Sequence, residues 1–400
     1  MTIEDLTKLA NEVDVQNIKF PKIRVEKNAV GLVPSYLVAN KFKNIVLVFD
    51  GNTRKAAGNQ IEQLLSDGNF QVTTIELSPN RHGEVIADEQ TLMQLIVEMP
   101  NNADVILAVG SGTIHDVVRF TGFKMTIPFI SVPTAASVDG FTSKGAPLIL
   151  RGVKKTIQTA SPVAVFADID ILKKAPQEMT AAGFGDIIGK YTSLLDWKIS
   201  YLVGNEPYNQ LAADLTRESL EACVNSAGEI AKKEDNGIKI LMQSLIESGL
   251  VMLVLDHSRP ASGGEHHLSH YWEMELLKKD AKQLLHGAKV GIATTIIIDL
   301  YKQMVVDLDD NKLSPNLKKF SENFGQIKSL IEELPSSSQI RNMLRKVGGA
   351  GTPADLEIDN TLITRSLNEA FHLRKRCTGL FLINQFKQED IKYPIKKISI

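Results

Sequence analysis

The chain has 400 residues, 43% of them hydrophobic, and its 45 basic residues nearly balance 47 acidic ones. Single cores stop growing near roughly 250–300 residues, so this length predicts two domains, and the near-neutral charge gives no basic field for binding nucleic acid. Only Cys223 and Cys377 are present, which excludes a disulfide framework and a thiolate zinc site, so any metal must be held by His, Asp or Glu.

The N-terminal residues "MTIEDLTKLANEVD" are acidic and amphipathic, unlike a secretory signal. Apolar runs such as "GLVMLVL" are far shorter than the ~20 residues that span a bilayer. We therefore expect a cytoplasmic protein without membrane insertion.

The first third of the chain alternates short apolar runs with helical patterns. This alternation predicts a parallel sheet with helices on both faces. The expected strands are residues 43–50, 70–77, 103–110 and 127–134, and the expected helices are residues 53–68, 88–99 and 113–124.

Residues 145–168 carry short β runs without an intervening helix, and they predict an added hairpin followed by a final strand. From about Asp170 the pattern is helical almost to the end. The fold class expected is an α/β, Rossmann-like parallel-sheet domain, residues 1–169, that binds the nucleotide. An all-α domain, residues 170–400, would bind metal and substrate, with the active site in the cleft between the two.

A strand-to-helix junction with two glycines lies in "ILAVGSGTIHDVVRF", residues 106–120. Gly110 and Gly112 allow a tight turn, after which the free N–H groups of a helix start would favour phosphate. The third glycine of the dinucleotide fingerprint is absent, so a plain turn is an equal alternative. Asp50, at the end of the first expected strand, has either a ribose-binding role or that of a turn aspartate.

A loop of small and hydroxyl residues, "VPTAASVDGFTS" at residues 132–143, follows a buried strand. Thr134, Ser137 and Ser143 allow close approach of a ligand, and Asp139 adds one charge. An ordinary connecting loop has the same composition.

Five of the eight histidines fall between His257 and His286. In a helix, His266 and His270 share one face while His267 points elsewhere. With His286 and the glycine-flanked Asp186 of "GFGDIIGK", the cluster has the Asp and His ligands of a catalytic metal site with an open position.

These motifs, with "SGGEHHLSH" and "LHGAKVGIAT", occur in an order and at spacings that resemble the sn-glycerol-1-phosphate dehydrogenase family, including its bacterial AraM type. That family lies within the dehydroquinate synthase and iron-containing alcohol dehydrogenase superfamily. The resemblance runs from about Asp50 to Thr295.

The resemblance implies a role for each site residue. Asp186, His266 and His286 match the metal ligands, and Asp139, Asp186 and His270 match catalytic or substrate-contacting positions. The cofactor-binding positions are Asp50, Gly110, Gly112, Thr113, Ile114, His115, Asp116, Thr134, Ala135, Ala136, Ser137 and Ser143. Two residues depart from the family pattern: His115 within the glycine motif and Gly264 before Glu265.

The implied activity is reduction of dihydroxyacetone phosphate to sn-glycerol 1-phosphate, a phospholipid precursor, with NAD(H) or NADP(H) and one divalent metal, zinc or nickel. His270 would protonate the alkoxide and Asp139 would hold a substrate hydroxyl. Arg259 is either a phosphate ligand or a surface arginine. The expected partners are a phosphorylated small molecule and a second copy of the chain in a homodimer.

Three alternatives stay open from the sequence. A glycerol dehydrogenase would use the same metal ligands on an unphosphorylated substrate. A 3-dehydroquinate synthase-like enzyme would need several basic residues near the histidines, where "SRPASGGEHH" offers one arginine. A non-catalytic sensor of a nucleotide or sugar phosphate would keep the fold without turnover.

Overall fold

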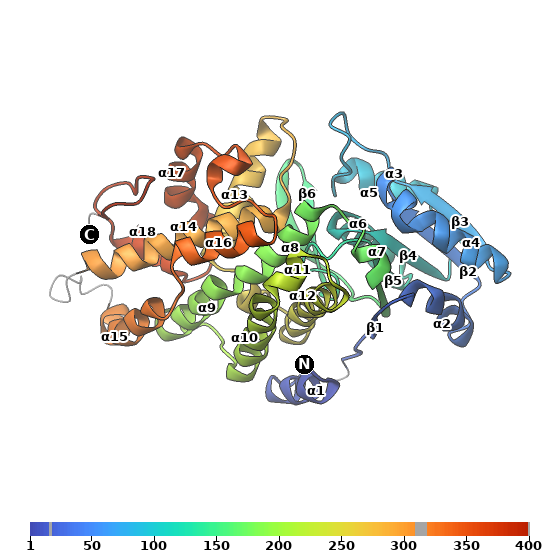
Figure 1. The fold of residues 1–400 in the computed structure, drawn as a ribbon, viewed down its shortest axis with the longest axis horizontal. Coiled ribbons are helices and arrows are strands. Elements are labelled where there is room, and N and C mark those ends of the chain that lie inside the picture. Colours follow the sequence, from blue (N-terminus) through green and yellow to red (C-terminus); the bar gives the residue numbers. More distant parts are fainter. Residues whose placement is uncertain (16–17, 309–317, 399–400) are drawn as a thin grey trace. The chain divides into compact units, whose positions relative to one another are not determined.

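In the computed structural model, which describes residues 1–15, 18–308 and 318–398, six parallel strands form one sheet in the order β1-β8-β5-β4-β2-β3 (Figure 1). The strands are β1 (Lys22–Glu26), β2 (Asn44–Phe49), β3 (Gln71–Glu76), β4 (Val105–Gly110), β5 (Phe129–Pro133) and β8 (Ala164–Asp168). Strands β4, β5 and β8 are buried along their whole length, as expected for a parallel sheet covered on both faces.

Helices cover both faces of this sheet. One face packs against the 3-10 helix η1 (Ala29–Leu32), α2 (Val33–Ala39), the π-helical turn η2 (Arg54–Gly58), α4 (Asn59–Asp67) and α7 (Ile169–Leu172). The short helix α3 (Gly51–Thr53) leads directly into η2. The other face packs against α5 (Glu89–Glu98), α6 (Gly112–Met125) and an antiparallel hairpin of β6 (Gly145–Leu150) and β7 (Val153–Gln158). The expected parallel sheet, its helices and the added hairpin are therefore confirmed.

One strand, β1, escaped the sequence-based prediction. Among the described strands it pairs with β8 alone, at the edge of the sheet, and its residues alternate between exposed and half-buried. An edge strand lacks the continuous apolar run by which the central strands were recognised.

The chain divides into two compact units, which we describe separately: residues 1–183 with 226–256, and residues 184–225 with 257–400. The first unit includes α1 (Ile3–Glu12), α11 (Ala227–Ala231) and α12 (Asp235–Leu255), because α12 packs against α1, β1 and α7. These units differ from the domains expected from the sequence, residues 1–169 and 170–400. The assignment of cofactor binding to one domain and metal and substrate binding to the other stays a prediction.

Helix α12 alone, among the described residues, is long and apolar enough to cross a membrane, with a mean hydropathy of 1.8. The short apolar runs in the sequence did not reveal this helix as a whole. In its 18-residue apolar window, 67% is buried inside the structure, as in a core helix.

The second unit is helical. Its elements are the end of α8 (Gln177–Ile188), α9 (Lys190–Gly204), α10 (Gln210–Asn225), η3 (Arg259–Ala261), α13 (Gly264–Lys278), α14 (His286–Asp307), α15 (Lys318–Glu332), α16 (Ser337–Lys346), η5 (Pro353–Leu356), α17 (Asn360–Glu369), η6 (Ala370–Leu373) and α18 (Gly379–Phe386). Helices α13 and α14 pack against each other, and both contact α9. This packing places the histidine-bearing helix starts in one region.

Candidate active site

The three segments expected to bind a nucleotide follow β2, β4 and β5, which are neighbours in the sheet. The chain passes from β2 to β3 on one side and, after β4, continues to β5 on the other. The order in which successive strands join the parallel sheet therefore reverses between β2 and β4. Ligands of open α/β sheets bind at such a switch point, outside the carboxyl ends of the strands. Asp50 and the Gly110–Gly112 turn lie at this point.

The turn after β4 needs small residues. A Cβ on Gly110 would lie 2.6 Å from the Ile114 side chain, and one on Gly112 would lie 3.0 Å from Val138. Helix α6 begins at Gly112, and the side chain of its N-cap residue Ser111 forms no capping hydrogen bond. The first N–H groups of α6, including that of Thr113, are thereby left for an anionic ligand.

Asp50 has a structural role in addition to any contact with a nucleotide. It is the N-cap of α3, and its Oδ1 accepts from the backbone N–H groups of Asn52 (2.9 Å) and Thr53 (2.8 Å). The turn-aspartate alternative therefore describes what Asp50 does in the fold. Its contact with ribose stays a prediction.

The side chains of Ile114 and His115 point into the core. Ile114 is 1% exposed and packs with the sheet, and the His115 ring contacts Phe141 edge-on. His115 Nδ1 donates to the Ser111 carbonyl (2.8 Å), which leaves Nε2 to accept from the Ser131 hydroxyl (2.8 Å). Both ring nitrogens thus have protein partners. These two hydrogen bonds explain how the core accommodates a histidine where the family pattern has another residue.

Burial lowers the pKa of His115 to about 3, and the charge of Arg119 adds to the shift. Because the unfolded value is near 6.5, the folded state binds fewer protons. The stability from neutral His115 is full above pH 6.5 and falls by about 1.4 kcal/mol per pH unit as the pH drops toward 3. We expect His115→Gln, measured by denaturant unfolding from pH 7 to 4, to lose this slope; His372→Gln, at an exposed position, is the control. If the free energy of unfolding depends on pH in the same way for His115→Gln and the unmodified protein, the prediction is wrong.

The loop after β5 is buried and is held by hydrogen bonds to α12. Asp139, 9% exposed, accepts from the Ser248 hydroxyl at 2.8 Å, and the Thr142 hydroxyl donates to the Ile246 carbonyl at 2.8 Å. The other predicted residues of this loop are also buried: Thr134, Ala135, Ala136, Ser137 and Ser143.

Arg119 of α6, fully buried, donates to the carbonyls of Gly140, Phe141 and Gly145 and pairs with Asp116 at 3.1 Å. It thus joins the predicted cofactor residue Asp116 to the loop that carries Asp139. Neither Arg119 nor Ser248 could be found from the sequence, because no spacing pattern links either residue to this loop.

The three expected metal ligands converge within the second unit. Asp186 of α8, His266 of α13 and His286 of α14 each offer an atom, and these atoms lie within 4.8 Å of one another. Asp186 Oδ1 is 3.6 Å from His266 Nε2 and 3.8 Å from His286 Nε2. One carboxylate and two imidazoles suit zinc and other divalent transition metals.

Gly185 permits the close approach of two helices that carry ligands. A Cβ at this position would lie 2.3 Å from the Gly287 carbonyl oxygen and 3.6 Å from Gly291 Cα. The glycine therefore fixes α8 against α14, next to Asp186 on one helix and His286 on the other.

Replacing Gly185 with alanine should force α8 and α14 apart. Such overpacking costs about 1–3 kcal/mol of stability, and it should also weaken metal binding because Asp186 and His286 separate. Unfolding in denaturant and metal content after dialysis measure both effects. Gly325→Ala, in α15 with nothing within 4 Å of the new Cβ, is the matched control and should be neutral or stabilising. Equal metal content in the two variants would contradict the argument.

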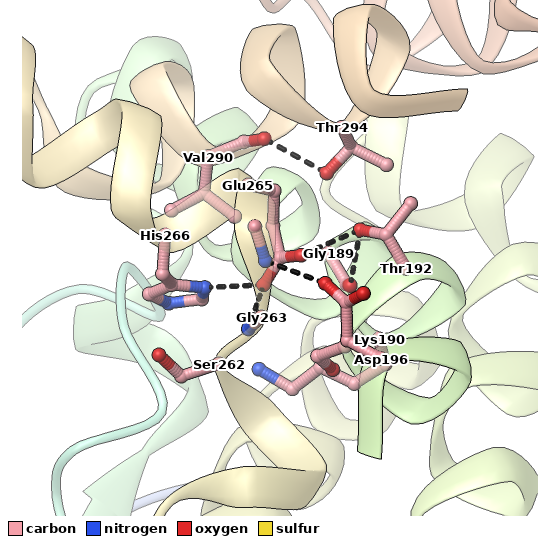
Figure 2. A network of polar contacts seen from close by, with 12 residues as sticks. Gly189, Lys190, Thr192, Asp196, Ser262, Gly263, Glu265, His266, Val290 and Thr294 are labelled. Carbon is pink, nitrogen blue, oxygen red and sulfur yellow. Dashed lines mark hydrogen bonds and ion pairs between the residues drawn. The ribbon is translucent and has the colours of Figure 1, made fainter. Parts of the chain in front are cut away.

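Glu265, fully buried, orients the His266 ring. Its Oε1 accepts from His266 Nδ1 (2.8 Å) and from the Gly263 N–H (2.6 Å), and its Oε2 accepts from the Thr192 hydroxyl (2.7 Å). Figure 2 shows the Glu265 carboxylate between His266 and Thr192. With the proton on Nδ1, the lone pair of Nε2, on the side of the ring that faces Asp186, is left for a metal ion. The sequence analysis named Glu265 only as part of its motif.

Lys190 is a buried cation beside Asp186. Its Nζ donates to the Asp186 carbonyl at 2.9 Å and lies 3.8 Å from Oδ1. Burial disfavours the Asp186 charge, but Lys190 and the two imidazoles outweigh it and hold the pKa of Asp186 below its usual range. The carboxylate is therefore ionised at neutral pH. The four-residue spacing from Asp186 was the available signal for Lys190, although Lys190 begins the next helix, α9.

The other clustered histidines have different surroundings. The His270 ring centroid lies 5.9 Å from that of His266 and 5.8 Å from that of His286, so His270 adjoins the ligand set. His267 is fully buried, and neither of its ring nitrogens has a hydrogen-bond partner among the described residues. His257 contacts Trp197 edge-on.

Arg259, one candidate for holding a phosphate, pairs with Glu206. Its Nε lies 2.7 Å from Glu206 Oε2, and the two side chains are 22% and 14% exposed. A guanidinium engaged with a carboxylate is less available to a phosphate.

Known proteins are similar to this chain over most of its length. Residues 24–176 match the model of a family described as iron-containing alcohol dehydrogenase. The glycerol-1-phosphate dehydrogenase (NAD(P)+) of Geobacillus stearothermophilus is 45% identical over 96% of this chain and 98% of its own length. The corresponding enzyme of Bacillus subtilis is 46% identical over 92% of each chain, and that of Pyrococcus horikoshii is 33% identical over 89% of this chain and 91% of its own.

Solved structures share the fold. A glycerol dehydrogenase from Schizosaccharomyces pombe aligns with a TM-score of 0.63 at 18% identity, covering 88% of this chain and 83% of its own. A probable glycerol dehydrogenase from Sinorhizobium meliloti 1021 aligns with a TM-score of 0.64 at 16% identity, covering 88% and 89%. Because sequence relatives match nearly the whole chain at 33–46% identity, this protein belongs to the glycerol-1-phosphate dehydrogenase family.

Proposed function

We propose that this chain is an NAD(P)-linked glycerol-1-phosphate dehydrogenase that reduces dihydroxyacetone phosphate to sn-glycerol 1-phosphate. The observation that carries the proposal is the convergence of Asp186, His266 and His286 in a member of this family. When bound, a divalent metal would polarise the substrate carbonyl, and a nicotinamide cofactor would carry the hydride.

The residues of the second unit prepare the substrate. Asp186, ionised beside Lys190, and the Nε2 atoms of His266 and His286 would hold the metal. His270, next to both imidazoles, would donate the proton that the product alkoxide needs, directly or through a water molecule. An imidazole suits this task because its ordinary pKa is near neutral.

The residues of the first unit would bind the cofactor and orient the substrate. The N-terminal turn of α6, with Thr113, would receive the pyrophosphate, and Asp50 the ribose. Asp139, held by Ser248, would accept a hydrogen bond from a substrate hydroxyl. The proposed cofactor segments belong to the first unit and the proposed metal ligands to the second.

The test is oxidation of NADH and of NADPH by the purified protein with dihydroxyacetone phosphate. Untreated, chelated, and zinc- or nickel-restored samples are compared, with unphosphorylated dihydroxyacetone as competitor substrate. Turnover that depends on both the phosphate and a restorable metal is expected, with sn-glycerol 1-phosphate as the product in a chiral assay. Faster turnover of the unphosphorylated substrate would favour a glycerol dehydrogenase, and no turnover with any metal would overturn the proposal.

We further propose a homodimer in the cytoplasm, with zinc or nickel as the metal. Light scattering of the purified protein tests whether it is a dimer. Metal analysis of protein isolated without added metal tests the identity of the metal. A monomer or a metal-free preparation with full activity would contradict them.

A further inference from the structure

Two arginines on the segment between η6 and α18 meet the loop that leads into α13. Arg376 Nη1 donates to the Ser262 carbonyl (2.5 Å) and its Nη2 to the Ser258 hydroxyl (3.0 Å). Arg374 Nη1 lies 3.3 Å from the hydroxyl oxygens of both Ser258 and Ser262. All four side chains belong to the second unit. The acceptors of these guanidiniums are therefore neutral.

The neighbouring carboxylates are occupied by other donors. Asp196 accepts from two backbone N–H groups and from the Tyr301 hydroxyl. Glu206 accepts from Arg259 and from one backbone N–H, and both oxygens of Glu265 are used as described above. Within the described part of the chain, neither Arg374 nor Arg376 forms an ion pair with a carboxylate.

The guanidiniums of Arg374 and Arg376 lie close enough to each other to repel, although the charges of Glu206 and Glu265 are also nearby. Burial and the like charges of Arg374 and Arg259 lower the pKa of Arg376 to about 9. The fully buried ring of His267 lies beside the same two guanidiniums. Neither ring nitrogen of His267 has a hydrogen-bond partner among the described residues, as noted above. An anion between these groups would supply what each of them lacks.

A small cavity opens beside these groups. Arg376, Ser262, Arg259 and Thr378 line it together with Asp196, Trp197 and Ser200. Ser262 lies four residues before His266, and Figure 2 shows it beside Gly263 at the start of the helix that carries this ligand. One residue that lines the cavity is therefore close in sequence to a metal ligand.

We propose that Arg374 and Arg376, with the hydroxyls of Ser258 and Ser262, bind the phosphate group of the substrate. This inference rests on the proposed function. The planar guanidinium forks match phosphate oxygens, and the serine hydroxyls can rotate to donate to the same group. Arg259, which the sequence suggested for this role, remains paired with Glu206. The site would distinguish dihydroxyacetone phosphate from its unphosphorylated counterpart.

The first test measures binding without turnover. Inorganic phosphate is titrated calorimetrically into the metal-loaded protein and into Arg374→Gln, Arg376→Gln and Arg376→Lys. Loss of one charge-assisted contact should weaken phosphate binding about tenfold to a hundredfold, and Arg376→Lys should recover part of it. Arg365→Gln, whose guanidinium pairs with Glu275 at 2.9 Å, is the matched control and should bind phosphate normally. No phosphate binding, or equal binding by all variants, would overturn the proposal.

The second test connects the site to the substrate. In Arg374→Gln and Arg376→Gln, KM for dihydroxyacetone phosphate should rise by about the same factor, while KM for dihydroxyacetone should hardly change. Equal changes for both substrates would overturn the assignment to the substrate phosphate and indicate a site for free phosphate or a structural role. Arginine-dependent phosphate binding in a protein that turns over neither substrate would instead overturn the proposed function and leave an anion site. Unfolding midpoints show whether each variant is folded, and Arg376→Lys provides the comparison if a glutamine variant is not.

Discussion

Replacing His266 with alanine is expected to remove the bound metal and nearly all activity. The substitution deletes one of three metal ligands and leaves only the two that Asp186 and His286 offer. Loss of several kcal/mol of transition-state stabilisation from the metal corresponds to a fall in kcat/KM on the order of 10³. Metal content after dialysis and steady-state kinetics with dihydroxyacetone phosphate measure the two effects.

His372→Ala is the matched control for this experiment, because His372 is an exposed histidine of the same unit. It should keep both metal and activity. His267→Ala is a poorer control than its sequence position suggests, since the ring is fully buried and its removal leaves a cavity. Full metal content in a folded His266→Ala protein would refute the three-ligand site.

Replacing Glu265 with glutamine is expected to weaken metal binding about tenfold to a hundredfold, the effect typical of losing a carboxylate behind a ligand histidine. Glutamine can still accept from His266 Nδ1 and Gly263 through its oxygen, but the negative charge that makes the imidazole a better donor is lost. Competition with a chelator for zinc measures the affinity. At saturating zinc, the activity of the variant should fall by a smaller factor than its affinity for zinc.

Glu275→Gln is the matched control for Glu265→Gln. Glu275 lies on the same helix but pairs with Lys278 (2.7 Å) and Arg365 (2.9 Å), away from the ligand histidines. Its replacement should leave zinc affinity unchanged. If the two variants bind zinc equally well, Glu265 does not support His266 in the way the contacts suggest.

Much of the fold followed from local patterns in the sequence. The central strands are continuous apolar runs because helices cover both faces of the sheet, and the helices between them end at recognisable residues such as Gly68, the C-cap of α4. Strand β1 did not follow, because an edge strand exposes alternate residues. The place of α12 in the first unit also did not follow, since it depends on contacts far apart in the sequence.

The sequence by itself determined the chemical types in the site: one carboxylate and two imidazoles for a metal, a glycine turn before a helix, and a loop of small residues after a strand. These signals are local because they arise from residue type and short spacing. Only the tertiary structure decided that Asp186, His266 and His286 converge from three helices, that Glu265 holds one of them and that His115 points into the core. Such choices depend on packing between distant segments, where the space around each side chain and the partners within hydrogen-bond distance set its role.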